Sequence, residues 1–148
     1  MGETHVLRLL GVDRAIDGEL MVCDERWDGP RAICDLSLHF DGTVMTASSS
    51  DYFEALRDLR RRLDAIGLRP SIYGASRNVW PSGMCRDMGL GCTAYRMTLG
   101  RPALQADLVS IFDTGPDVEP VGVDEQRAFF DAWLASLGLG GPRPGSSS

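Results

Sequence analysis

The chain has 148 residues, of which 43% are hydrophobic and 24% are charged, and these proportions are typical of a folded globular protein rather than a disordered one. The formal net charge is −6 at pH 7, and all fifteen basic residues are arginines. An acidic total argues against a general DNA-binding protein, which normally carries a basic surface.

The first part of the chain predicts a series of strands. Residues 4–10 are rich in apolar side chains and are interpreted as the first strand. Residues 19–26 and 31–40 flank a Trp-Asp-Gly-Pro sequence at 27–30, and Asp-Gly between two alternating runs is typical of a β-hairpin. A second Asp-Gly pair at 41–42 leads into a further strand, which we expect at residues 43–47.

The register of the first hairpin depends on its turn. A two-residue turn at Asp28-Gly29 sets Cys23 opposite Cys34 and Met21 opposite Leu36, all on the buried face. The next residue is a proline, which lacks the N–H that closes a tight turn, so a longer loop is an equal alternative. Two buried thiols are the favoured interpretation of the cysteine pair, although the spacing leaves a disulfide open.

A helix is predicted over residues 52–66. Asp51 is a good N-cap residue and Glu54 stands at the capping-box position, while Gly67 and Pro70 end the helix. Apolar residues recur at steps of three and four and form a buried stripe. We expect the arginines to lie on a solvated face and to pair with acids, the alternative being a docking surface for an acidic partner; they are Arg57, Arg60, Arg61 and Arg62.

The second half of the chain predicts further strands and one more helix. Short strands are expected at 71–74, 93–99 and 108–112, the last two joined as a hairpin, and a second helix is expected at 124–137. This order predicts an α+β fold, with an antiparallel or mixed sheet and about two helices packed on one face. Residues 1–138 are interpreted as one globular domain, and the Gly/Pro/Ser-rich residues 139–148 as a disordered tail.

The sequence predicts a cytoplasmic protein that is not associated with a membrane. No apolar run approaches the roughly 20 residues that span a bilayer, and the first residues do not resemble a secretory signal. The four cysteines form no C-x-x-C pair, and the only histidines are His5 and His39, so we expect neither a metal nor a cofactor. The pattern does not decide the oligomeric state.

Residues 74–92 are the segment most open to a functional interpretation. The segment is rich in glycine and arginine and lacks a clean strand pattern, apart from a helical turn expected at 84–88. Irregular segments of this length are uncommon in compact domains and are often functional. Guanidinium groups and glycine-rich backbone amides can hold a phosphate or carboxylate, and an exposed tryptophan can anchor a partner. The candidate binding residues are Arg77, Asn78, Trp80, Ser82, Arg86 and Arg96.

Two other interpretations of this segment stay open. In the first, it is an ordered structural loop whose arginines pair with nearby acids, while Trp80, Met84 and Met88 fill the core. In the second, Cys85 is a nucleophile whose pKa is lowered by Arg86 beside it. A nucleophilic cysteine also needs a base, and only the two histidines could serve.

The C-terminal half carries a resemblance to a known group of proteins. The stretches PSGMCRDMGLGCTAYRMTLGRPA, DLVSIFDTGPDVEP and DEQRAFFDAWL resemble small uncharacterised bacterial proteins that occur near secreted-toxin loci. The resemblance implies a bacterial accessory protein, such as an immunity protein. It implies no activity and no catalytic residues.

These observations rank three hypotheses for the function. The first is a non-catalytic protein-binding module, such as an immunity or adaptor protein, because no catalytic constellation is visible. Its partner is expected to be basic, such as a nuclease toxin, since residues 1–50 hold nine acids against four arginines. The second is a small-ligand or anion-binding domain that uses the segment 74–92. The third is a small enzyme with Cys85 as its nucleophile.

Overall fold

The structure is a computed structural model, and it describes residues 2–138. The larger sheet is formed by β1 (Glu3–Leu10), β2 (Ala15–Val22), β3 (Arg26–Asp28), β4 (Arg31–Phe40), β5 (Thr43–Ser49) and β6 (Arg69–Pro70). The strands run in the order β3-β4-β2-β1-β6, with β5 paired to β4, and every pair is antiparallel. A second sheet of three strands is formed by β7 (Val79–Trp80), β8 (Thr93–Arg96) and β9 (Leu108–Ser110).

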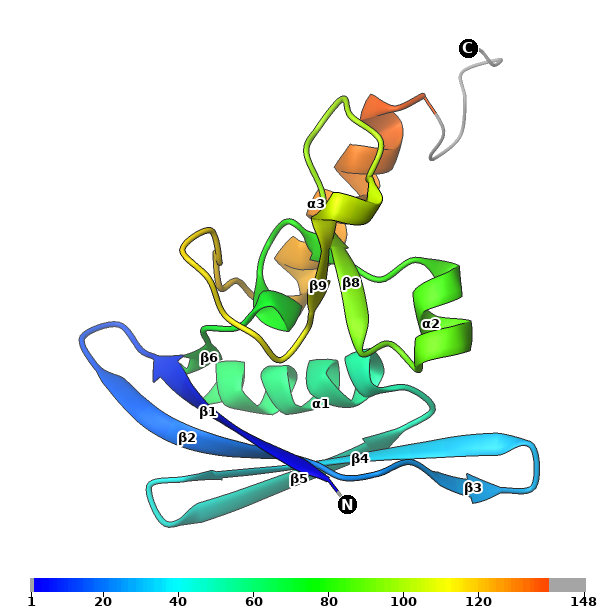
Figure 1. Ribbon diagram of the computed structural model, residues 1–148. Helices are drawn as coiled ribbons and strands as arrows, with labels where there is room; N and C mark the ends of the chain where they lie inside the picture. Colours follow the sequence, from blue (N-terminus) through cyan, green and yellow to red (C-terminus); the bar gives the residue numbers. More distant parts are fainter. Residues whose placement is uncertain (1, 139–148) are drawn as a thin grey trace.

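The predicted α+β class is confirmed. The helices are α1 (Tyr52–Ala65), α2 (Gly83–Gly89) and α3 (Val123–Ser136), and short 3₁₀-helices η1 (Tyr73–Ala75) and η2 (Gln105–Asp107) lie between strands. All three α-helices lie on one side of the larger sheet, and the small sheet lies on that same side, beyond α1 (Figure 1). The opposite face of the larger sheet is not covered by any described element (Figure 1).

Helix α1 forms where the sequence predicts it. The Asp51 side chain accepts a hydrogen bond from the Glu54 backbone N–H at 2.8 Å, which caps the first turn. Gly67 has φ +77°, a conformation that glycine adopts without strain, and it ends the helix. Because α1 lies between the two sheets, it is buried on more of its circumference than a single apolar stripe would cover (Figure 1).

The hairpin of β3 and β4 has a different register from the predicted one. Asp28 pairs with Arg31, so the two-residue turn lies one position later than predicted, at Gly29-Pro30. Val22, not Met21, pairs with Leu36, and Met21 is therefore on the open face. Strand β4 pairs with β3 near the turn and with β2 further along. Residues 23–25 lie between β2 and β3, and the register against β4 differs by one residue on their two sides. In the structure all four cysteines are free thiols.

The strand predicted at 71–74 is wrong. The backbone N–H of Ser71 donates to the Arg8 carbonyl oxygen at 2.8 Å, but the chain then turns away into η1. There the N–H groups of Tyr73 and Gly74 donate to Asp113 and Ile111. The predictions at 93–99 and 108–112 are confirmed as the shorter antiparallel pair β8 and β9, and the helix at 124–137 as α3. The predicted tail at 139–148 lies outside the described residues.

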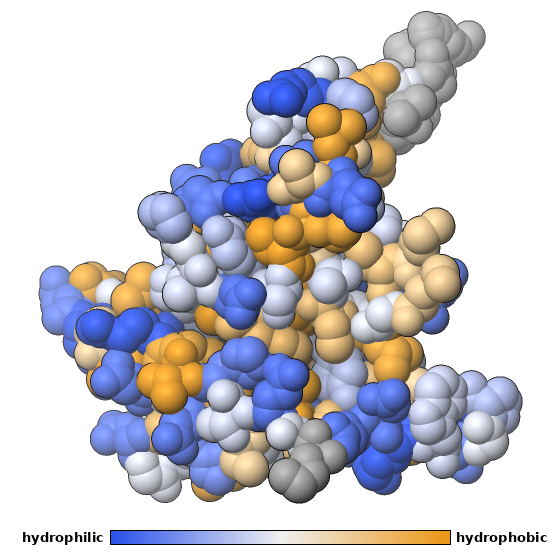
Figure 2. All heavy atoms as spheres, viewed as in Figure 1, coloured by the Kyte–Doolittle hydropathy of each residue, from blue (hydrophilic) through white to orange (hydrophobic). Residues whose placement is uncertain are grey.

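The accessible surface is mostly hydrophilic. In the view of Figure 2, hydrophobic side chains lie around β8, β9 and the loop that joins them, and a second group lies at the lower left. In that loop Leu99 and Leu104 are 52% and 56% exposed. The second half of α3 extends beside this loop, away from the larger sheet (Figure 1).

Candidate functional site

Residues 74–92 are more regular than predicted. They contain the end of η1, strand β7 and helix α2, and this helix confirms the turn expected at 84–88. Helix α2 presents Met84 and Met88 to solvent, with exposed fractions of 71% and 81%. The prediction that both methionines fill the core is therefore wrong.

Trp80 is a core residue of the second sheet. It is 7% exposed and its ring is stacked on that of Phe130, with centroids 4.8 Å apart and planes inclined by 13°. Three guanidinium groups lie over the indole ring, those of Arg57, Arg86 and Arg127, at 5.4, 5.9 and 5.6 Å from its centroid. The indole therefore orients arginines by cation–π contact and does not offer an exposed face for stacking.

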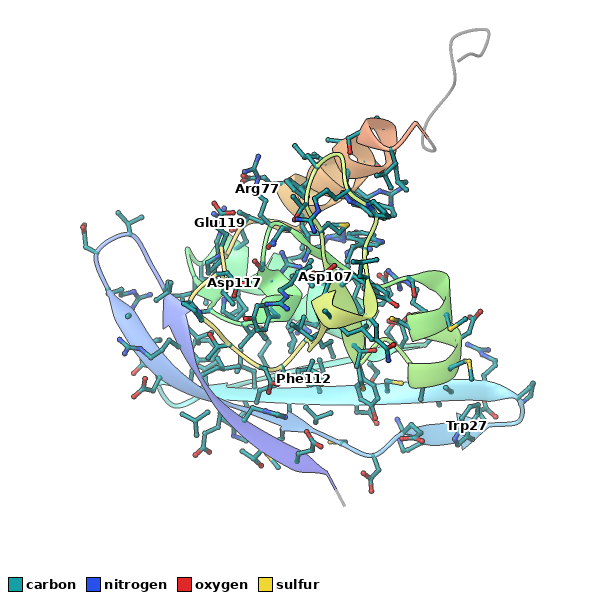
Figure 3. All side chains as sticks on the ribbon, turned by 45° about the horizontal axis from the view of Figure 1, so that its top comes forward. Trp27, Arg77, Asp107, Phe112, Asp117 and Glu119 are labelled. Carbon is teal, nitrogen blue, oxygen red and sulfur yellow. The ribbon has the colours of Figure 1, made fainter. Side chains whose placement is uncertain are left out.

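The three arginines proposed as an anion site pair with different acids. Arg86 lies 2.8 Å from Asp51 and 3.1 Å from Glu54 at the start of α1. Arg77 lies 3.7 Å from Glu125 and Arg96 lies 3.4 Å from Asp117. Arg77, Asp117 and Glu119 appear on the side of the molecule away from Trp27, which marks the β3–β4 hairpin (Figure 3). The structure does not bring the three guanidinium groups together around one space.

Asn78 and Ser82 hold the local backbone conformation. The Asn78 side-chain carbonyl accepts from the Ser76 hydroxyl at 2.9 Å, and the Asn78 backbone carbonyl accepts from the Met97 N–H at 2.7 Å. The Ser82 hydroxyl accepts from the Cys85 N–H at 3.1 Å and caps α2. The residues of the predicted site thus serve several separate structural contacts.

Opposing effects act on the thiol of Cys85. Burial raises its pKa, but hydrogen bonds with the side chains of Ser82 and Thr93 outweigh that effect, so the pKa is below its ordinary value. The two histidines make contacts elsewhere. His39 bonds to Ser37 at 3.1 Å on the open face of the sheet, and His5 lies 2.7 Å from Glu3. Among the contacts of the described residues, neither histidine bonds to Cys85, so no imidazole is placed to act as its base.

The cysteines are expected to differ in their rates of alkylation. Burial raises the pKa of Cys34 and of Cys92 to about 11. At pH 8 we expect iodoacetamide to modify Cys85 at least about tenfold faster than Cys92, because more of its thiol is ionised. Mass spectrometry of the native protein after timed quenching measures both rates. Equal rates for Cys85 and Cys92 would contradict the lowered pKa.

Arg60 lies in the core, although the sequence predicts it on a solvated face. The prediction that it is solvated is wrong: Arg60 is 3% exposed. Its guanidinium donates to the carbonyl oxygens of Gly74 and Val121 at 3.1 and 3.0 Å and to the Gln126 side-chain oxygen at 2.6 Å. Burial lowers the pKa of Arg60 to about 9. A signal for the burial of Arg60 is present in the sequence, because Arg60 lies on the same helical stripe as Phe53, Leu56 and Leu63.

Gln126 completes this buried network. It is fully buried, and its side-chain NH₂ donates to the carbonyl oxygens of Gly74, Ser76 and Val79 at 3.1, 2.9 and 3.0 Å. Arg60 and Gln126 therefore join α1, α3 and the segment 74–79 through the backbone. The side chains of this network bond to groups of the protein itself rather than to a ligand, so the role of the network is structural.

The open face of the larger sheet carries a row of side chains that spans four strands. Val6, Glu19, His39 and Val44 are paired in turn across β1, β2, β4 and β5, and so form one row across the sheet. Val6 and Val44 are 73% and 59% exposed. This row lies in a hollow of about 580 Å³, whose lining also includes Asp17 and Asp41.

Carboxylates border the hollow on this face. Asp17 is paired with Arg8 at 3.3 Å, with both side chains largely exposed. Glu19 and Asp41 have no ion pair with another described residue. By contrast, residues 51–100, which contain α1 and α2, hold five acids against eight arginines. Within residues 1–50, five of the nine acids lie on strands of the larger sheet and four lie in its turns and loops.

Comparisons with known proteins add no family assignment. No protein-family model matches the chain, and a search of curated proteins gives no match. Between residues 2 and 138, no group of three or more His, Cys, Asp or Glu side chains is arranged to hold a metal ion. No helix in this described range is both long and apolar enough to cross a membrane.

Proposed function

We propose that the chain is a non-catalytic protein-binding module that binds a basic partner on the open face of its larger sheet. The observation that carries this proposal is the row of Val6, Glu19, His39 and Val44, which places exposed apolar side chains beside a carboxylate on an uncovered face. The valines lie at the two ends of the row, with Glu19 and His39 between them, so the row offers a partner both apolar contact and a carboxylate.

The charges favour a basic partner over an acidic one. Glu19, Asp17 and Asp41 border the hollow, and Arg8 is the one arginine paired to any of them among the described residues. A cationic partner would gain complementary contacts and faster association, while an acidic one would be repelled. We further propose an immunity or adaptor role in a bacterial cytoplasm, which rests on the resemblance of the C-terminal half.

The proposal is tested by comparing two variants that each add one arginine. Val44→Arg places a cation on the open face, and Ala128→Arg places one on an exposed position of α3. The immobilised wild-type protein and Ala128→Arg are expected to retain the same stoichiometric basic protein from a lysate of the native host. Val44→Arg is expected to retain at least about tenfold less, because the introduced cation repels the partner and disrupts the apolar contact.

Two results would count against the proposal. One is equal retention by Val44→Arg and by wild type, which would move the interface elsewhere on the molecule. The other is the absence of any stoichiometric protein. Circular dichroism and urea unfolding of both variants verify that each retains the fold.

A further inference from the structure

A second site lies on the other side of the molecule from the open sheet face. It is a cavity of about 330 Å³ between α3, the β7–β8 pair and the loop that follows β8. This volume lies at the small end of the range of ligand pockets in proteins. Its lining is almost entirely apolar and consists of Trp80, Pro81, Ser82, Tyr95, Met97, Pro102, Ala103, Phe130, Trp133 and Leu137.

Aromatic rings dominate the walls of this cavity. Trp80, Phe130 and Trp133 form a ladder, with successive centroids 4.8 and 6.2 Å apart and planes inclined by 13° and 25°. Tyr95 adds a fourth ring. Aromatic rings interact with one another by offset stacking and by edge-to-face contact, beyond the benefit of apolar burial. Trp80 is buried by its own contacts, so a guest can reach only the half-buried rings of Tyr95, Phe130 and Trp133. These rings favour a planar aromatic guest over a polar or highly branched one.

The cavity is held open by hydrogen bonds on its outer wall. The Trp133 indole N–H donates to the Arg101 carbonyl oxygen at 2.8 Å, and the Gly100 N–H donates to the Ser136 hydroxyl at 2.7 Å. These two bonds fix the loop after β8 against the second half of α3, so that the loop cannot collapse into the space without losing them. A pre-formed site of this kind avoids part of the ordering cost of binding.

We propose that this cavity is a binding site for a small planar aromatic molecule of one or two rings. The site is independent of the proposed protein interface, because its residues belong to the second sheet, the loop after β8 and α3. Tyr95 supplies a hydroxyl group to the lining, and this group can orient a ligand that carries one polar group, whereas the Ser82 hydroxyl is hydrogen-bonded to the Cys85 N–H. The half-exposed Leu99 and Leu104 lie on the same loop and extend its apolar surface.

The probe for the test is 5-fluoroindole, followed by the ¹⁹F signal of the ligand and by the methyl signals of ¹³C-methyl methionine in the full chain. We expect saturable one-to-one binding, with a Kd on the order of 100 µM for a ligand of about ten heavy atoms. The methyl group of Met97, which lines the cavity, is expected to shift with the same Kd. The methyl groups of Met84 and Met88, which are exposed on α2, are expected not to move.

A matched pair of variants tests the location. Ala103→Trp places a bulky ring at a half-buried position in the wall, and Ala132→Trp places the same ring at an exposed position of α3 outside it. We expect Ala103→Trp to weaken binding at least tenfold and Ala132→Trp to leave it unchanged. The proposal is overturned by a lack of saturation up to 1 mM probe, by a shift of Met84 or Met88 in place of Met97, or by equal effects of the two variants. The methionine readout uses the unmodified chain, so it decides the matter even if Ala103→Trp does not fold.

Discussion

Replacing Arg60 with methionine is expected to lower the free energy of unfolding by about 3 kcal/mol, a value in the range for breaking a buried charged network. The variant keeps much of the side-chain volume but removes three hydrogen bonds. The Val121 carbonyl and the Gln126 side-chain oxygen lose the guanidinium that satisfies them. Urea unfolding measures the change. The control is Arg61→Met, since Arg61 is exposed and we expect its loss to cost less than about 0.5 kcal/mol.

The same network also predicts the stability of a variant in which both side chains are replaced. Substituting both partners of a buried ion pair by apolar residues often restores stability, but here most acceptors are backbone carbonyl oxygens that substitution cannot remove. Arg60→Met combined with Gln126→Leu is therefore expected to stay destabilised relative to wild type, because the Gly74 carbonyl loses both side-chain donors and the Ser76 and Val79 carbonyls lose the Gln126 donor. A double variant as stable as wild type would show that the carbonyl groups find other partners.

Replacing Gly74 with alanine is expected to lower the free energy of unfolding by about 2 kcal/mol, which is typical of overpacking a core. Gly74 is buried, and its N–H donates to the Ile111 carbonyl oxygen at 2.8 Å. A Cβ atom at this position would lie 2.9 Å from that oxygen, closer than such atoms approach in proteins. Either the hydrogen bond or the packing of η1 against β9 must give way.

The matched control for Gly74→Ala is Gly83→Ala in the first turn of α2. An added Cβ at Gly83 meets no atom within 4 Å, and alanine favours the helix. We expect this variant to be as stable as wild type or slightly more stable in the same urea experiment. A loss for Gly74→Ala no larger than that for Gly83→Ala would contradict the tight packing of η1.

Local patterns predicted the longer helices and most of the longer strands, but not η1, β7 or how the two halves of the chain meet. Helix α1 follows from the Asp51 cap, the apolar stripe along the helix and Gly67 at its end, and each of these signals is local in the sequence. Arg60 was misplaced because its burial depends on Gln126, which lies 66 positions away in the sequence. Periodicity marks one buried face of a helix, and it does not show that a second layer covers another.

The candidate residues show the same division between local and distant information. A tryptophan and two arginines in a glycine-rich segment resemble a binding loop, yet Trp80 is buried on Phe130, which the sequence places in a different element. The register of β2 against β4 was wrong for a similar reason, because residues 23–25 interrupt a pairing that the turn alone cannot define. The open sheet face was not identified, since strand alternation does not tell which outward side chains stay uncovered.

Whether the row across the open sheet face binds a basic protein is decided by the Kd of the captured partner for the two arginine variants. With Kd measured at constant low salt, we expect Val44→Arg to weaken binding at least about 30-fold, as for a residue inside an interface. For Ala128→Arg we expect a change of less than about twofold. An equal Kd for Val44→Arg and wild type would show that the partner binds elsewhere on the molecule.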